Sequence, residues 1–180
     1  MSSILKPYTT LIDFVTGREV PNIGAEENRQ AVERYLVEQK GYDRIDITVD
    51  ARIALDIGGD IYRSQVDLVV TVDRRVRLMV IKCAAGALGS WERQTLAAAR
   101  LFSDHQIPYA VVSDGKTALL TDSTTGKKIG EGMEAIPSKT QARRMLASVR
   151  LQPLPEERRE RESLIFRTYD KESVNVQRNL

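Results

Sequence analysis

The central feature of the sequence is a pair of apolar runs, RSQVDLVVTV at residues 63–72 and RVRLMVIKC at residues 75–83. Each run becomes apolar on both faces in its middle, as strands in the centre of a sheet do. Only Asp73 and Arg74 lie between the two runs. Two-residue connections are the commonest links in β-hairpins, so we expect two antiparallel strands joined by a tight turn.

The expected hairpin brings an aspartate close to a lysine. With this two-residue turn, Asp67 lies opposite Val80, and Lys82 points to the same face one pleat further along. An aspartate or a lysine within apolar strands is costly unless it is paired, hydrogen-bonded or bound to a cation. A buried structural ion pair and a functional site therefore both remain open.

Helices and further strands flank the hairpin. Apolar residues at helical spacing before Gly41 predict a first helix, and a period-2 run from Ile45 to Leu55 predicts the next strand. In all we expect helices at residues 26–40, 91–103 and 137–149, and further strands at residues 45–55, 107–113 and 118–122. This order of elements indicates an α/β fold with a mixed sheet.

The chain reads as one domain with an extension. At 180 residues and 42% hydrophobic residues, it is long enough for a single core, which we place in an α/β domain at residues 1–150. Residues 151–180 form a charged extension that we expect to begin as a solvated helix. Pairs four residues apart, Glu157 with Arg161 and Arg158 with Glu162, support that helix.

The extension also carries apolar side chains. They are Leu164, Ile165, Phe166 and Tyr169, enough to dock on the domain or on a second copy of the chain. We therefore expect a homodimer formed through the C-terminal extension as one of the outcomes.

The net charge of the chain says little about its binding partners. The net charge of +2 creates no global basic field, so contact with DNA would need a local patch. Lys139, Arg143 and Arg144 lie in a segment without acidic residues and are candidate phosphate contacts. A solvated, solubilising helix face is the alternative.

Several function classes are excluded. The N-terminus has no apolar signal region and no run is long enough for a membrane span, so we expect a cytoplasmic protein without membrane contact. Cys83 and His105 are the only residues of their kinds. We expect Cys83 to be a small buried hydrophobe and His105 to lie on the surface. Any chemistry must therefore use carboxylates, lysine and arginine.

The order and spacing of several motifs resemble a known family. They include EENRQ at residues 26–30, YRSQVDLVV at residues 62–70 and MVIK at residues 79–82. Together they resemble the N-terminal domain of type I restriction enzyme R subunits, which belongs to the PD-(D/E)XK nuclease superfamily. The resemblance covers roughly residues 10–140. It implies a restriction-endonuclease-like mixed β-sheet flanked by helices, with an α-β-β-β-α-β core.

The resemblance implies roles for the hairpin residues. Asp67 would bind a divalent metal, and the Ile81 carbonyl could add a ligand. Lys82 would hold the attacking water or the charge that develops on phosphate.

The resemblance also implies roles for helix residues. Glu26 or Glu27 would add a carboxylate, with Glu26 better matched by spacing, and Gln94 would orient the site or the DNA strand. Each has a simpler explanation, since acidic residues favour a helix N-terminus and Gln94 can face solvent.

The sequence departs from the family at one position. The acid of the family's E-x-K motif falls at Val80, which has no oxygen for Mg²⁺. The strands then carry Asp67 as their only site carboxylate, so we expect a magnesium site that is weak or absent. Glu26, or Glu92 near the start of the second helix, is a candidate replacement.

Two functions follow from these observations. The first is a stand-alone, metal-dependent DNA endonuclease of the type I R-subunit kind whose activity is weakened or lost. The second is a non-catalytic nuclease-fold module that binds nucleic acid or a protein partner, which Val80 favours. Whether the chain is an enzyme stays open at this level, because a fold alone does not establish activity.

Overall fold

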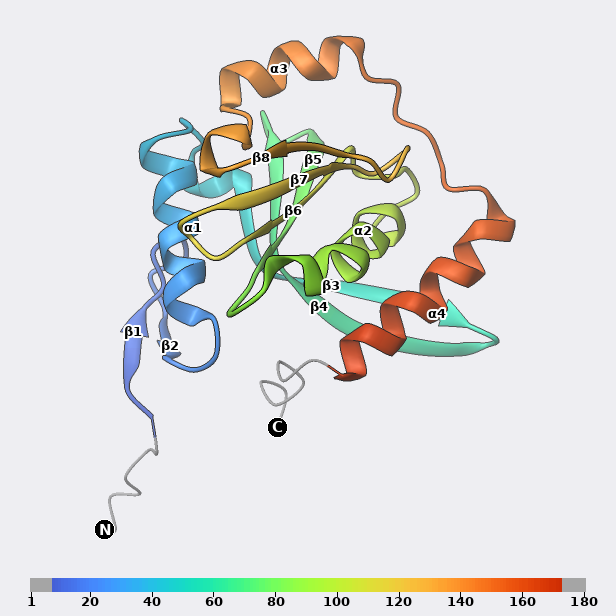
Figure 1. Ribbon diagram of the computed structural model, residues 1–180, viewed down its shortest axis with the longest axis horizontal. Helices are drawn as coiled ribbons and strands as arrows, with labels where there is room; N and C mark the ends of the chain where they lie inside the picture. Colours follow the sequence, from blue (N-terminus) through green and yellow to red (C-terminus); the bar gives the residue numbers. More distant parts are fainter. Residues whose placement is uncertain (1–7, 173–180) are drawn as a thin grey trace.

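The computed structural model describes the backbone of residues 8–172 and the side chains of residues 8–170 (Figure 1). Its centre is a six-stranded sheet of order β3-β4-β5-β6-β7-β8. The strands are β3 (Ile47–Ile57), β4 (Asp60–Val72), β5 (Val76–Cys83), β6 (Tyr109–Ser113), β7 (Ala118–Asp122) and β8 (Lys128–Glu131). A separate two-stranded sheet pairs β1 (Thr10–Ile12) with β2 (Glu19–Pro21).

Four α-helices and three short 3₁₀ turns complete the described part of the chain. The helices are α1 (Glu26–Glu38), α2 (Glu92–Leu101), α3 (Lys139–Ser148) and α4 (Glu156–Glu172). The turns are η1 (Arg44–Asp46), η2 (Leu88–Trp91) and η3 (Met133–Ala135). Strands β5 and β6 are parallel, and α2 supplies the crossover that a parallel pair requires. The remaining neighbours are antiparallel, so the expected mixed α/β sheet is confirmed.

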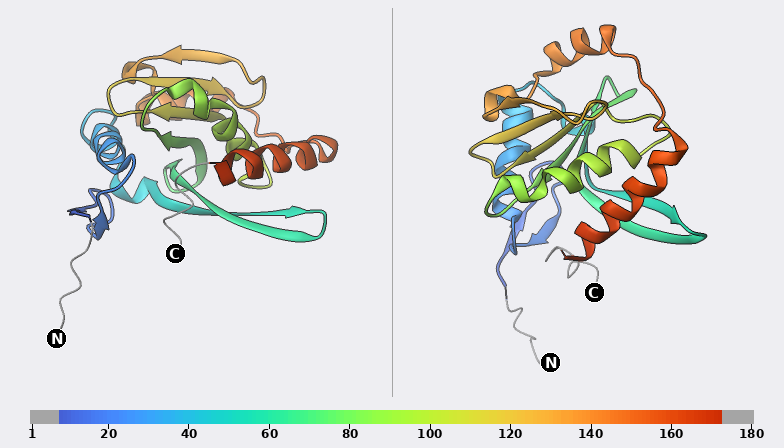
Figure 2. Two further views of the ribbon diagram at one scale, coloured as in Figure 1. Left: turned by 60° about the horizontal axis from the view of Figure 1, so that its bottom comes forward. Right: turned by 45° about the vertical axis from the view of Figure 1, so that its right-hand side comes forward.

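The helices cover the two faces of the sheet in pairs (Figures 1 and 2). On one face, Val32 and Leu36 of α1 and Ala142 of α3 pack with buried strand residues such as Leu68. On the other face, α2 and α4 pack against residues such as Val80. Each layer removes the apolar side of its helices from water, which is the main stabilising contribution to such a fold.

The register of the β4–β5 hairpin differs from our expectation. Three residues separate the strands, and Asp73 and Arg74 adopt left-handed φ angles of 52° and 58°. A bulge between Val70 and Thr71 shifts the pairing again. Leu68 consequently pairs with Ile81, so the prediction that Asp67 lies opposite Val80 is wrong. The longer turn and the bulge instead place Asp67 level with Lys82.

The β3–β4 hairpin is bent, so its two ends pack in different apolar layers of the domain (Figure 2, left). Ile47, near its base, packs on the α1 face, whereas Ile53 and Leu55 pack on the α2 face. The bend coincides with Asp50, whose φ of 50° is left-handed and whose place in the ladder is skipped. This curvature brings the far half of β4 against the C-terminal helix.

The C-terminal extension is helical, as expected, and docks on its own domain. Helix α4 contacts α2 and β3, and Phe166 is fully buried between them. Glu162 points inward to Arg93 and Arg100, so the expected surface pair with Arg158 is wrong. Between residues 8 and 172, no helix combines the length and the apolar character needed to cross a membrane.

The sequence predicted the environments of Cys83 and His105 correctly but did not predict three short strands. Cys83 is buried among apolar residues of β5, and His105 is exposed shortly after α2. Strand β8 and the β1–β2 pair were not expected, because each is only three or four residues long and shows little alternation.

Candidate functional site

Asp67 and Lys82 form a close pair on adjacent strands. Lys82 Nζ lies 3.1 Å from Asp67 Oδ2, and the backbone N–H of Cys83 donates to the same oxygen at 2.8 Å. The side chain of Asp67 is 10% exposed and that of Lys82 is 13% exposed. The carboxylate is therefore largely removed from water but compensated by one cation and one backbone donor. The structure thus places both residues on one face of the sheet, as the sequence predicted.

The ammonium of Lys82 has a second neighbour. It lies 4.9 Å from the centre of the Trp91 ring, at the end of η2. An ammonium over an indole face is stabilised electrostatically, so the Trp91 ring gives Lys82 a second favourable contact beside the Asp67 carboxylate.

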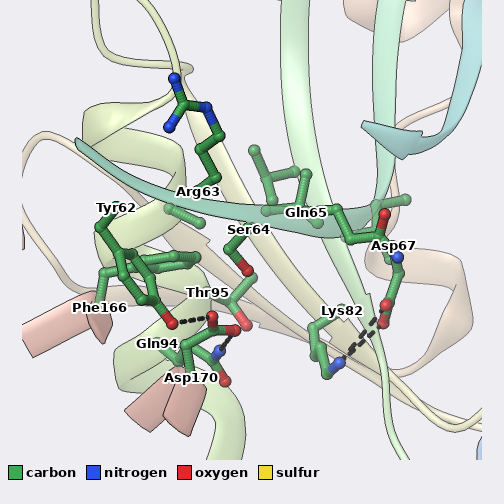
Figure 3. Close-up of a pocket in the computed structure, with 14 residues that line it drawn as sticks. Tyr62, Arg63, Ser64, Gln65, Asp67, Lys82, Gln94, Thr95, Phe166 and Asp170 are labelled. Carbon is green, nitrogen blue, oxygen red and sulfur yellow. Dashed lines mark hydrogen bonds and ion pairs between the residues drawn. The ribbon is translucent and has the colours of Figure 1, made fainter. Parts of the chain in front are cut away.

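A cavity of about 100 Å³ opens beside this pair (Figure 3). It is lined by three elements of the domain, β4, β5 and α2, and by α4 of the extension. Its polar lining includes Tyr62, Ser64, Asp67, Lys82, Gln94, Thr95 and Asp170. Val80, Ile81 and Phe166 contribute apolar surface. The cavity is thus the place where the hairpin pair meets both helices of this face.

Gln94 faces this cavity and not the solvent. It is 7% exposed, and its Nε2 donates to Asp170 Oδ1 at 3.1 Å. Asp170 Oδ2 also accepts a hydrogen bond of 2.6 Å from the hydroxyl of Tyr62. Burial, and then the hydrogen bond to Asp170, raise the pKa of Tyr62 well above its usual range, so its hydroxyl remains a donor.

Glu26 and Glu27 do not line the cavity. Glu26 is 2% exposed and accepts a hydrogen bond of 2.6 Å from Arg29 Nη2. Glu27 is exposed and accepts a hydrogen bond of 2.8 Å from Asn22 Nδ2. Our expectation that one of them would join Asp67 and Lys82 in a single concave site is therefore not met by this cavity.

Glu26 belongs to a second buried charge cluster, centred on Arg29. The guanidinium lies 3.1 Å from Asp13, 3.9 Å from Glu33 and 3.5 Å from Asp50, in addition to Glu26. We call these five residues the Arg29 cluster. Burial, followed by the charge of Asp13, raises the pKa of Glu33 to about 8. The cluster thus holds more acid than one guanidinium neutralises.

The expected basic patch lies on the opposite face of the sheet from the cavity. Lys139 Nζ is 2.6 Å from both Asp43 and Asp46. Arg143 makes a forked interaction with Asp73, with contacts of 2.6 and 3.0 Å. Arg144 is exposed on the same helix. The α3 residues therefore are not gathered at the cavity, and two of them already bind carboxylates.

The residues at the cavity do not fit a complete magnesium site. Mg²⁺ takes an octahedron of oxygen ligands. Both oxygens of Asp67 lie near Lys82 Nζ, at 3.1 and 3.4 Å, and Val80 offers no oxygen. Glu92, the other candidate replacement, does not line the cavity. Within the described residues, no three Asp, Glu, His or Cys side chains gather as potential metal ligands.

The comparison with protein families assigns the domain. The family described as type I restriction enzyme R protein N terminus (HSDR_N) matches residues 24–137, more than half of the chain. The chain belongs to this family. The match includes Asp67, Lys82 and Gln94 and ends before α4, so Phe166 and Asp170 lie outside it.

A solved structure supports the fold. It is the fragment of a chain assigned as the HsdR subunit of a type I restriction enzyme from Vibrio vulnificus YJ016, with a TM-score of 0.53 and 19% identity. The alignment covers 68% of this chain and 25% of that chain, so the present chain spans about a quarter of the HsdR fragment. No curated protein matches the sequence.

Sequence reasoning missed the contributions of Tyr62 and Asp170. Tyr62 lies in the quoted family motif, but its orientation depends on the bend of β4. Asp170 is 108 residues away from Tyr62 in the sequence, and no local pattern connects the two.

Proposed function

We propose that this chain is a nuclease-fold module of the type I restriction R N-terminal kind that binds DNA and has severely weakened or lost metal-dependent cleavage. The observation that carries the proposal is the pairing of Asp67 with Lys82 beside Val80. Where the family's motif has an acid, a valine that is 1% exposed packs into the apolar layer under α2. The lysine therefore neutralises the remaining carboxylate, and the pair does not require a metal for its stability.

The lining of the cavity supports a phosphodiester backbone as the ligand. Lys82, Gln94 and Tyr62 all present donors of the kind that bind phosphate oxygens. Lys82 can exchange the Asp67 carboxylate for a phosphate without being left unpaired, because both are anions. Membership in a type I restriction family agrees with a DNA ligand.

Metal titration followed by thermal unfolding tests the loss of the metal site. A ligand that binds only the folded state raises its stability by about 2.7 kcal/mol at a hundred times its Kd. We expect millimolar Mn²⁺ or Mg²⁺ to shift the Tm of wild type no more than that of Asp67→Ala. A metal-induced rise in Tm that disappears in Asp67→Ala would overturn this part of the proposal.

A residual metal-dependent DNA endonuclease is the second candidate. It is favoured because Asp67, Lys82 and Gln94 border one cavity. Supercoiled DNA incubated with Mn²⁺ distinguishes the two candidates. Cleavage by wild type that is abolished in both Asp67→Ala and Lys82→Ala would establish the enzyme and show that another group replaces the missing acid.

Three finer expectations remain proposals. Arg144, and Lys139 and Arg143 after release from their carboxylates, would form a DNA contact on α3. Leu164 and Tyr169 are 41% and 40% exposed on α4 and would provide the apolar surface of a homodimer. The cytoplasm remains the proposed location.

A further inference from the structure

Two carboxylates of helix α4 accept hydrogen bonds from polar side chains of the domain. Glu162 accepts a forked pair of hydrogen bonds from Arg93, at 2.8 and 2.9 Å, and a further bond of 2.8 Å from Arg100. Two turns further along, Asp170 accepts from Gln94 and Tyr62. Three of the four donor residues lie on α2, so the polar side chains on one face of that helix donate their hydrogen bonds to carboxylates of α4.

These donors are of the type that binds phosphate. The planar fork of arginine fits a phosphate as it fits a carboxylate, and glutamine amides and tyrosine hydroxyls commonly bind backbone phosphates. Glu162 keeps its charge in this position. Burial alone would disfavour the anion, but the hydrogen bonds from Arg93 and the charges of Arg93 and Arg100 lower the pKa of Glu162. Each α4 carboxylate thus occupies a place that a phosphate group can fill.

We propose that α4 mimics a nucleic-acid backbone and covers a phosphate-binding face of α2 that continues into the Asp67–Lys82 cavity. The inference rests on the proposed DNA ligand and identifies where its backbone lies. When DNA binds, its phosphates replace Glu162 on Arg93 and Arg100, and replace Asp170 on Gln94 and Tyr62. Helix α4 moves away, and the cavity opens toward the strand.

The architecture fits a displaceable cover. The family match ends at residue 137, so the domain that defines the family does not include α4. Residues 151–153, which lead into α4, have exposed side chains, while the Gln152 carbonyl accepts from Gln106 N–H and Leu154 is buried. Gln94 is also only half satisfied, because its Oε1 is buried and accepts no hydrogen bond within the described residues. Because Oε1 is an acceptor, only the Nε2 donor of Gln94 can pass from Asp170 to a phosphate oxygen.

Two charge-matched double variants test the proposal. Glu162→Gln with Asp170→Asn removes the two inward carboxylates, whereas Glu157→Gln with Glu160→Gln removes two exposed carboxylates of the same helix. Binding of single- and double-stranded oligonucleotides is measured by fluorescence anisotropy in EDTA, with Tm recorded for each variant. We expect the inward variant to bind about tenfold more tightly than the matched control, because two competing carboxylates are gone.

The salt dependence gives a second, independent number. Each additional phosphate contact steepens the slope of log K against log salt by about 0.7–0.9. Phosphates reach Arg93 and Arg100 in both double variants once α4 has moved, so these two slopes should agree, whereas Arg93→Gln should flatten the slope by about 0.7–0.9. Equal affinities of the two double variants, or an Arg93→Gln slope equal to that of wild type, would overturn the proposal.

Hydrogen exchange on wild type avoids any effect of substitution on folding. Saturating DNA should speed amide exchange in α4 and slow it in α2. Slower or unchanged exchange in α4 with DNA bound would show that α4 is a fixed part of the fold, and the mimicry would be wrong while the proposed DNA binding stands. If no variant binds DNA at low salt, the proposed DNA-binding function fails together with this inference.

Discussion

Two buried groups of charge lie beneath different helices of the fold, one beside α1 and one beside α2, and they differ in their balance of acid and base. Around Arg29, four carboxylates surround one guanidinium. On the α2 face, Asp67 meets Lys82, and the single carboxylate of Glu162 meets two arginines. With Asp170 counted, the α2 face holds three carboxylates and three cationic side chains, so the Arg29 cluster has an excess of acid and the α2 face is balanced.

The two groups also differ in the origin of their partners. Arg29, Glu26 and Glu33 all lie on α1, so the acidic cluster forms largely within one helix. The α2 face receives Glu162 and Asp170 from an extension that lies beyond the family match. This difference suggests that the acidic cluster is a fixed part of the domain, whereas the cations of the α2 face have a partner that can be replaced. Glu26, one candidate for the missing site carboxylate, is held by Arg29.

Arg29→Met should produce the largest effect and would break the acidic cluster. Removal of one partner from a buried ion pair leaves the others uncompensated and typically costs about 3–5 kcal/mol. We expect a loss of that size in the free energy of unfolding, measured by urea denaturation. Arg34→Met, on the exposed side of the same helix, should cost about 1 kcal/mol or less. Equal losses in the two variants would show that the Arg29 cluster is not a structural centre.

The pH dependence of stability sharpens the comparison. The folded-state pKa of Glu33 is about 8, above its ordinary value of 4.5, so the folded protein binds this proton more tightly than the unfolded chain. The resulting stabilisation is fully present below about pH 4.5 and is lost as the pH rises through about 8. The loss is on the order of 1.4 kcal/mol for each unit between the two values.

Glu33→Gln provides the control for this effect. The amide cannot ionise, so the variant should show a flatter profile of unfolding free energy between pH 5 and pH 9. A profile as steep as that of wild type would assign the pH dependence to other groups.

Val80→Glu adds a carboxylate to the α2 face beside Asp67 and should have the smallest effect of the three changes. A carboxylate in this apolar layer, near Asp67, should destabilise the metal-free protein by about 1–3 kcal/mol. Millimolar Mn²⁺ should recover part of the loss in Tm and strengthen DNA cleavage. The same change combined with Asp67→Ala should not respond to metal. A single variant that neither binds Mn²⁺ nor cuts DNA would show that the absent acid is not the only defect.

Local patterns were sufficient to predict the four α-helices and the five longer strands, but not β8, the β1–β2 pair or the bend of β3. The alternation of β4 and β5 placed Asp67 and Lys82 on the same side, and this holds although the predicted register was off by two residues. A shift by an even number preserves the face, because side chains alternate with a period of two. The motifs at residues 62–70 and 79–82 were also sufficient to indicate the family.

Contacts between distant elements were decided only by the tertiary structure. Glu26 has the spacing expected of a site carboxylate, yet Arg29, one helical turn away, holds it in another cluster. Asp170 completes the cavity from α4, and the pairing of Glu162 with α2 instead of Arg158 depends on how the extension docks. Periodicity specifies which side of an element is apolar, but the choice among several oppositely charged partners depends on distance and burial, which exist only once the chain is folded.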